Sequence, residues 1–123
     1  MAEFSVTDDG SGVIRASVQG GRVDKPMAQA LCADIERASK NYPDGAKLLI
    51  DMGALSKATP GAGLYAMRSI KRLDPSSIAL FRANSFMRSF AQIVLRLARF
   101  RSYALFGREV DAREWLDRGR RSS

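Results

Sequence analysis

The run ATPGAG, residues 58–63, has the composition of a loop that binds phosphate. It follows the strand-like run KLLIDM, which contains Asp51, and it carries Thr59, Gly61 and Gly63. Glycine turns and helix N-termini hold phosphates through backbone N–H groups, and a hydroxyl group can accept a phosphoryl group. Four roles fit these residues: a phosphate loop, a nucleotide-binding turn, a phosphorylated switch and the start of a helix.

The spacing argues against a nucleotide-binding turn. Gly61, Gly63 and Ala66 match G-x-G-x-x-A, but eight residues separate Asp51 from Pro60, whereas a dinucleotide fingerprint begins directly after its strand. The sequence also lacks a Walker-type G-x-x-x-x-G-K-S/T motif. Thr59 followed by Pro60 is typical of a helix N-cap with proline at the first helical position. We therefore predict a capped helix start.

The side chains available for catalysis are few. The 123 residues include no histidine and one cysteine, Cys32. Ser-His-Asp and Cys-His catalysis, the usual zinc sites and an internal disulfide are therefore excluded. An enzyme would depend on carboxylate, Lys, Tyr or substrate-assisted chemistry. This composition favours a protein without catalytic activity, cofactor or metal.

Positive charge is concentrated in the second half of the chain. Residues 1–61 contain 7 Lys or Arg and 8 Asp or Glu, whereas residues 62–123 contain 13 and 5, within a net charge of +7. A phosphorylated ligand, an anionic membrane, an acidic protein surface and nucleic acid all fit such a surface. We expect no nucleic-acid binding, because the arginines lack interleaved aromatic residues and a recognisable module. Without a signal-like start or a membrane span, we expect a cytoplasmic protein.

Strand and helix patterns alternate in the order ββαβαβαβα. We predict one domain over residues 1–119, with Ser85 capping the third helix, Gly119 ending the last helix and residues 120–123 forming a basic tail. Alternation of this kind predicts parallel strands joined by right-handed crossovers. The predicted strands are 4–7, 13–18, 46–52, 78–81 and 102–106, and the predicted helices are 27–42, 60–73, 86–100 and 110–119.

The order of elements and the run LLIDMGALSKATPGAGLYAM resemble the STAS-like (SpoIIAA-like) domains, named for sulfate transporters and anti-sigma-factor antagonists. SIALFRAN, YALFG and VDAREWL resemble the STAS/SEC14-type branch, whose last helix carries Ala and Trp-Leu at the spacing of Ala112, Trp115 and Leu116. The resemblance implies a mixed α/β sheet of about five strands with four helices and an antiparallel first strand. It also implies a non-catalytic regulatory or protein-interaction module.

Regulatory members of that family carry DSSG at the turn, and a partner kinase phosphorylates the second Ser. Aligning Gly61 with that Gly places Pro60 at the phospho-acceptor and Thr59 at the first Ser. Proline has no hydroxyl group, so the resemblance implies that the usual switch does not operate at residue 60. Thr59 or Ser56 could accept phosphate instead, but a capping role for Thr59 is favoured.

The carboxyl ends of the parallel strands offer a second hypothesis, an anion site. Helix N-termini and two arginines meet at this edge, where ligands of open α/β sheets bind. Ordinary caps and solvated charges are the favoured alternative. The candidates for the switch loop or anion site are Asp51, Ser56, Thr59, Gly61, Arg82, Asn84, Ser85 and Arg108.

The third predicted helix is apolar over more than one stripe. Burial on two sides, a homodimer or partner groove, and contact with an anionic membrane all explain this pattern. The interface or pocket candidates are Phe86, Met87, Phe90, Ala91, Val94, Leu95 and Leu97.

Two functions follow from that helix. An interaction module, binding a protein partner or itself, predicts a filled core and an exposed apolar patch on the helix. The alternative, which the resemblance to the STAS/SEC14-type branch implies, is a binder of a small or lipid-like molecule with an anionic head. It predicts an apolar pocket lined by Met67, Phe86, Phe90 and Leu97 that opens near Arg82.

Overall fold

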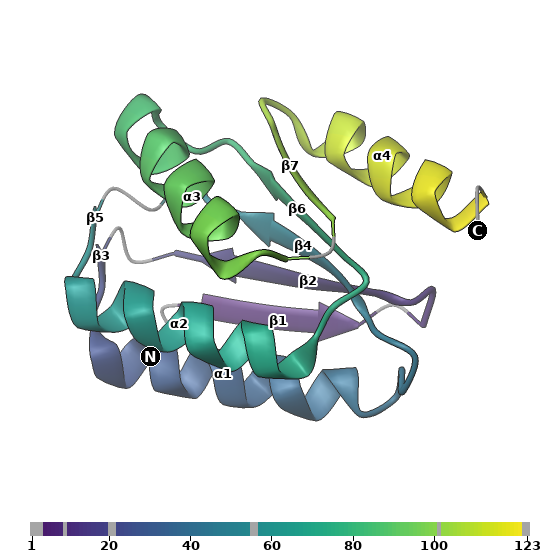
Figure 1. Ribbon diagram of the computed structural model, residues 1–123, viewed down its shortest axis with the longest axis horizontal. Coiled ribbons are helices and arrows are strands. Elements are labelled where there is room, and N and C mark those ends of the chain that lie inside the picture. The colour runs from purple at the N-terminus through teal and green to yellow at the C-terminus, as the bar shows by residue number, and fades with distance from the viewer. Residues whose placement is uncertain (1–3, 9, 20–21, 55–56, 101, 122–123) are drawn as a thin grey trace.

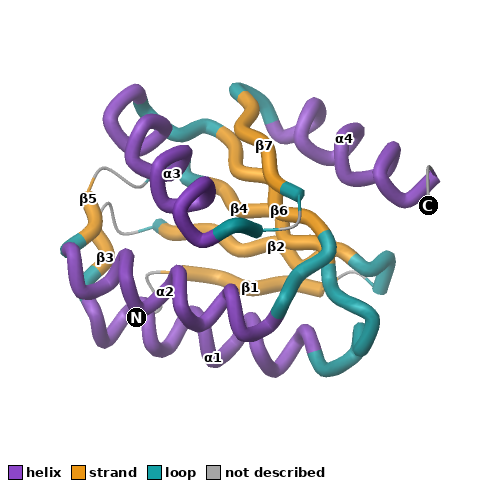
Figure 2. The backbone as a smooth tube through the Cα atoms, viewed as in Figure 1, coloured by secondary structure: helices purple, strands orange, loops and turns teal. Residues whose placement is uncertain are grey.

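The computed structural model describes residues 4–8, 10–19, 22–54, 57–100 and 102–121. The strands are β1 (Phe4–Asp8), β2 (Val13–Val18), β3 (Arg22–Val23), β4 (Lys47–Asp51), β5 (Lys57–Ala58), β6 (Ser77–Phe81) and β7 (Tyr103–Phe106). The helices are α1 (Lys25–Ser39), α2 (Pro60–Leu73), α3 (Ser85–Ala98) and α4 (Glu109–Arg121). Figures 1 and 2 show this arrangement.

Five strands form one mixed sheet in the order β1-β2-β4-β6-β7. β1 runs antiparallel to β2, and the other neighbours are parallel. The predicted mixed sheet and its four helices are confirmed. β3 and β5 add a two-stranded parallel sheet that was not predicted, because two-residue strands carry no periodicity.

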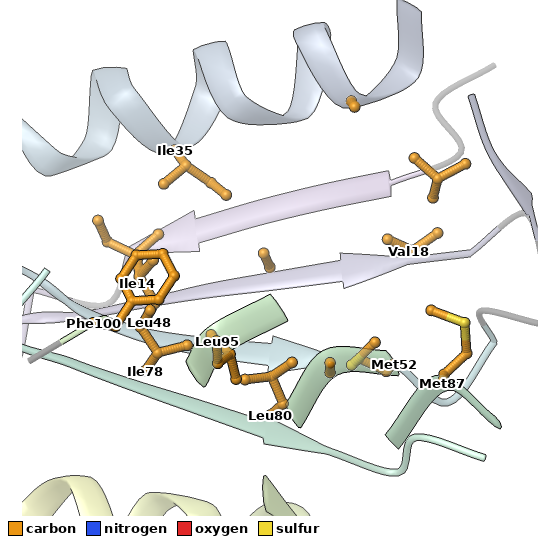
Figure 3. Close-up of a cluster of buried hydrophobic side chains, with 14 of the residues drawn as sticks. Ile14, Val18, Ile35, Leu48, Met52, Ile78, Leu80, Met87, Leu95 and Phe100 are labelled. Atoms are coloured by element: carbon orange, nitrogen blue, oxygen red, sulfur yellow. The ribbon is translucent and has the colours of Figure 1, made fainter. Parts of the chain in front are cut away.

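Each face of the sheet has its own core. Alternate side chains such as Ile14, Leu48 and Ile78 meet α1, α2 and α3, and Figure 3 shows these side chains beside Ile35 and Leu95. The side chains one position further along the strands point to α4, as the period of two requires. That smaller core contains Leu49, Ala79, Phe81, Ala112 and Leu116.

The helix ends correct three details of the sequence prediction. Thr59 is the N-cap of α2 as predicted, since its hydroxyl accepts a hydrogen bond from the Ala62 N–H at 3.2 Å. The prediction that Ser85 caps α3 is wrong, because the Asn84 side chain takes that role. The prediction that Gly119 ends the last helix is also wrong, since α4 extends to Arg121 and includes part of the expected tail. α1 begins at Lys25, two residues before its predicted start.

Candidate functional site

Asp51 lies at the end of β4 and is the centre of a charged cluster. Its carboxylate is buried, with 5% of the residue exposed. Arg82 donates to both carboxylate oxygens, and Arg15 donates to Oδ2 at 3.3 Å. The Gly53 N–H donates to Oδ1 at 2.8 Å. The structure therefore brings Asp51 and Arg82 together, as expected for residues that follow adjacent parallel strands.

Arg15 extends this cluster to α4. Its guanidinium binds both carboxylate oxygens of Glu109 at 3.0 and 3.1 Å. Arg15 and Arg82 also lie over the Phe81 ring, at 5.7 and 5.4 Å from its centroid. Arg15 and Glu109 were not among the predicted site residues. The available signal was an arginine in the apolar strand VIRASV, at a position that faces α4.

The arginines hold both carboxylates in the ionised form. Burial raises the pKa of Asp51, but the hydrogen bonds from Arg82 and Gly53 and the two arginine charges outweigh it, so the net pKa is lowered. Hydrogen bonding from Arg15 lowers the pKa of Glu109 despite partial burial. A group that works as a general acid near neutral pH needs the opposite shift. This cluster therefore stabilises charge and does not hold a proton for transfer.

The other anion-site candidates have local roles in the structure. The Asn84 side chain accepts a hydrogen bond from the Met87 N–H at 2.8 Å, and Thr59 caps α2 in the same way. Arg108 pairs with Asp111 at 3.2 Å. Gly61 and Ser85 are exposed in the first turns of α2 and α3, and Ser56 lies outside the described residues. This arrangement agrees with the alternative interpretation, in which these residues are helix caps and paired surface charges. Anion binding stays a prediction.

An apolar cavity of about 180 Å³ lies between the sheet and helices α1, α2 and α3. Met67 and Phe90 line it as predicted, whereas Phe86, Leu97 and Arg82 are absent from its lining. The prediction that Phe86 and Leu97 line the pocket, with Arg82 at its mouth, is therefore wrong. Arg82 instead binds Asp51 on the α4 face of the sheet.

Small residues explain why the space is unfilled. Its lining includes Ala16, Ala28, Ala62, Gly63 and Ala91, whose side chains are too short to reach across. At Gly63 an added Cβ would lie 3.3 Å from the Phe90 ring, so α2 and α3 approach closely there. The core on this face is therefore not completely filled.

The outer side of α3 exposes large apolar side chains. We define the α3 stripe as Phe86, Ile93 and Leu97, whose exposed fractions are 71%, 59% and 74%. They recur at i, i+7 and i+11 and so share one side of the helix. The remaining predicted interface residues face the core or its margin: Met87, Ala91 and Leu95 are buried, and Phe90 and Val94 are half-buried.

The segment that contains α2 and α3 is basic. Residues 60–100, which include α2 and α3, contain seven Lys or Arg and a single acidic residue, Asp74, a net charge of +6. Lys71 of α2 also contacts the end of α3, donating to the Arg99 carbonyl at 2.8 Å. The exposed patch predicted for an interaction module is therefore present, on a segment of net positive charge, whereas the filled core predicted with it is not.

The described residues contain no group of three or more His, Cys, Asp or Glu side chains placed to hold a metal ion. Within the same residues, every helix is too short or too polar to cross a bilayer. The cytoplasmic location stays a prediction.

Comparison with protein families gives no match, and no curated protein matches the sequence. Solved structures do match. An uncharacterized protein of the DUF3478 family from Shewanella loihica PV-4, with a SpoIIAA-like fold, has a TM-score of 0.73 at 12% identity, over 94% of this chain and 95% of that one. The Bacillus cell fate determinant SpoIIAA in its phosphorylated form has a TM-score of 0.57 at 20% identity, over 94% and 97%. Together with the strand order, these similarities show that the chain has the SpoIIAA-like fold of STAS-type domains.

Proposed function

We propose that this chain is a non-catalytic interaction module that binds a protein partner through the α3 stripe. The exposure of Phe86, Ile93 and Leu97 on one side of a single helix carries this proposal. A helix that only closes a core buries its large apolar side chains, and an apolar patch with a polar rim is typical of a binding surface. The lowered pKa values of Asp51 and Glu109 also fit a protein without acid–base chemistry.

The positive charge of the segment that contains α2 and α3 favours an acidic protein surface as the partner. The net charge of +6 over residues 60–100 attracts such a surface and increases its rate of association. A second copy docked stripe to stripe would bring two basic surfaces together, which costs free energy. An acidic partner is therefore favoured over self-association.

The proposed regulation does not depend on phosphate at the family's acceptor position. That position is occupied by Pro60, which starts α2, and the Thr59 hydroxyl is already used as the N-cap. Phosphate found on Thr59 in protein purified from cells would contradict this part of the proposal.

Site-specific photocrosslinking in the native host tests the interaction surface. Phe86 is replaced by benzoylphenylalanine, a similar aromatic side chain, and Gln92, exposed on another side of α3, provides the matched control. We expect one dominant crosslinked protein from position 86, absent from position 92 and weakened by added salt.

The identity of the adduct decides among the partners. A dimer of this chain would show self-association, and a lipid adduct would show a membrane contact. Either result, or the same adducts at both positions, would overturn the proposal of an acidic protein partner.

A further inference from the structure

We propose that the outer edge of β7 binds an extended, acidic segment of another protein as an additional strand. β7 is one of the two edge strands of the five-stranded sheet, and Figure 1 shows it at that border. An edge strand presents backbone N–H and C=O groups that can pair with a further strand. This edge contains none of the α3 stripe residues, so it is a second surface beyond the proposed one.

The ladder between β6 and β7 determines which backbone groups of β7 are left over. The Ser102 carbonyl accepts a hydrogen bond from the Ile78 N–H at 2.9 Å, and the Phe106 carbonyl also accepts one from the chain at β6. Because the backbone groups of successive residues point to opposite sides of a strand, those of Tyr103 and Leu105 point away from β6. Within the described residues these outward groups have no backbone partner. Each of the two residues therefore offers one donor and one acceptor.

β7 lacks the features that usually protect an edge strand from pairing. Its sequence, YALF, contains no charged residue and no proline, and all four residues are partly exposed. β1, at the other edge of the sheet, ends in the exposed polar residues Thr7 and Asp8. Charged residues and prolines at sheet edges prevent unwanted pairing. β7 is therefore the edge that suits a partner strand.

Charge determines which kind of strand fits. Residues 96–108, which include β7, contain four arginines and no acidic residue. A segment with acidic residues on both sides of an uncharged core therefore gains favourable charge interactions at each end of β7. A second copy of β7, paired antiparallel about a two-fold axis, would instead bring Arg99 of one chain toward Arg108 of the other, which costs free energy. An acidic segment of another protein is therefore favoured over self-association.

Amide hydrogen exchange followed by NMR tests the site on the whole protein. The probe is a short peptide with a Thr-Val-Thr-Val-Thr core between two pairs of glutamates. We expect the peptide to slow exchange at the Tyr103 and Leu105 amides, with little change at the Ala104 and Phe106 amides, which face β6. The same peptide with lysines in place of the glutamates is the control and should bind at least about tenfold more weakly.

Three outcomes would overturn the proposal. Unchanged exchange at Tyr103 and Leu105 would remove the site, and equal binding of the lysine peptide would remove the acidic class of partner. Protection of these two amides that increases with protein concentration, without peptide, would show that a second copy occupies the edge.

A proline variant tests whether the backbone of β7 carries the binding. Leu105→Pro removes an outward N–H but no hydrogen bond of the ladder with β6, a change that edge strands tolerate. Leu105→Ala is the matched control, because it also loses the leucine side chain but keeps the N–H. We expect Leu105→Pro to bind the glutamate peptide at least about tenfold more weakly than Leu105→Ala. If Leu105→Pro does not fold, Tyr103→Pro and Tyr103→Ala make the same comparison.

Equal binding by the folded proline and alanine variants would overturn strand pairing. Leu97→Ala, which shortens the α3 stripe, should bind the peptide like the original protein. A loss of binding in Leu97→Ala as large as that in the proline variant would show that the peptide binds the stripe, and would also overturn the assignment to β7.

Discussion

Gly53 shows how closely the backbone approaches the charged cluster around Asp51. A Cβ atom at this position would lie 3.1 Å from Asp51 Oδ1 and 3.1 Å from Arg82 Nε. The same residue donates its N–H to Asp51 at 2.8 Å. A side chain at residue 53 would therefore be crowded against both Asp51 and Arg82, while the backbone N–H of the same residue is hydrogen-bonded to Asp51. The absence of a side chain, and not an unusual backbone angle, makes glycine suitable here.

Replacing this glycine should destabilise the protein. We expect Gly53→Ala to lower the free energy of unfolding by about 1–2 kcal/mol, the usual cost of forcing an extra carbon into a packed site. Gly61→Ala is the matched control, because no atom lies within 4 Å of its added Cβ. That change in the first turn of α2 should raise stability by about 0.4–1 kcal/mol. Urea unfolding measures both, and equal effects would contradict this account of Gly53.

At the scale of the element, α3 combines a buried and an exposed apolar side. The sequence shows that α3 has more apolar residues than one core contact needs. It does not show which of them are buried and which are exposed, because Phe86 and Met87 are both large apolar residues. The division depends on where α2 and the sheet lie, since Met87 is buried and Phe86 is exposed. Tertiary contacts therefore decide which of the predicted residues form a core wall and which form a surface.

Two leucines of α3 test this division with the same substitution. Leu95 is 6% exposed and Leu97 is 74% exposed. We expect Leu95→Ala to lower the free energy of unfolding by about 2–3 kcal/mol, because it enlarges the cavity. Leu97→Ala should change it by less than about 0.5 kcal/mol, as surface substitutions do. Similar losses measured by urea unfolding would show that Leu97 is covered in solution.

At the scale of the whole molecule, regular periodicity made the fold predictable. Four strands with near-continuous or alternating apolar residues, each joined to an amphipathic helix, required a largely parallel sheet. The anion site stays a prediction, because spacing placed Asp51 and Arg82 at one edge of the sheet without showing that the two side chains pair with each other. Arg15 was missed because its partner Glu109 lies 94 residues away in sequence, and single-sequence patterns do not report such pairs.

The charged cluster joins β2, β4, β6 and α4, so the ionisation of its two carboxylates should affect the free energy of unfolding of the whole domain. The folded-state pKa values of Asp51 and Glu109 lie below their ordinary values of 3.8 and 4.5. In acid the unfolded chain therefore binds more protons than the folded one, and stability rises with pH. This contribution is complete above about pH 5.5 and is lost as the pH falls through the ordinary values to the lower folded ones.

Asp51→Asn removes one of these carboxylates and should make the stability of the protein depend less on pH. At pH 7 we expect a lower urea midpoint than in the original protein, because Arg15 and Arg82 lose their shared anion. At pH 3 the difference should be smaller, since the unfolded chain is then largely protonated at this residue and the carboxylate contributes less to stability. Asp34→Asn, which breaks the exposed pair with Arg37, is the control and should leave both midpoints nearly unchanged. A difference for Asp51→Asn that is equal at both pH values would show that the side chain acts through its shape and hydrogen bonds, and not through its charge.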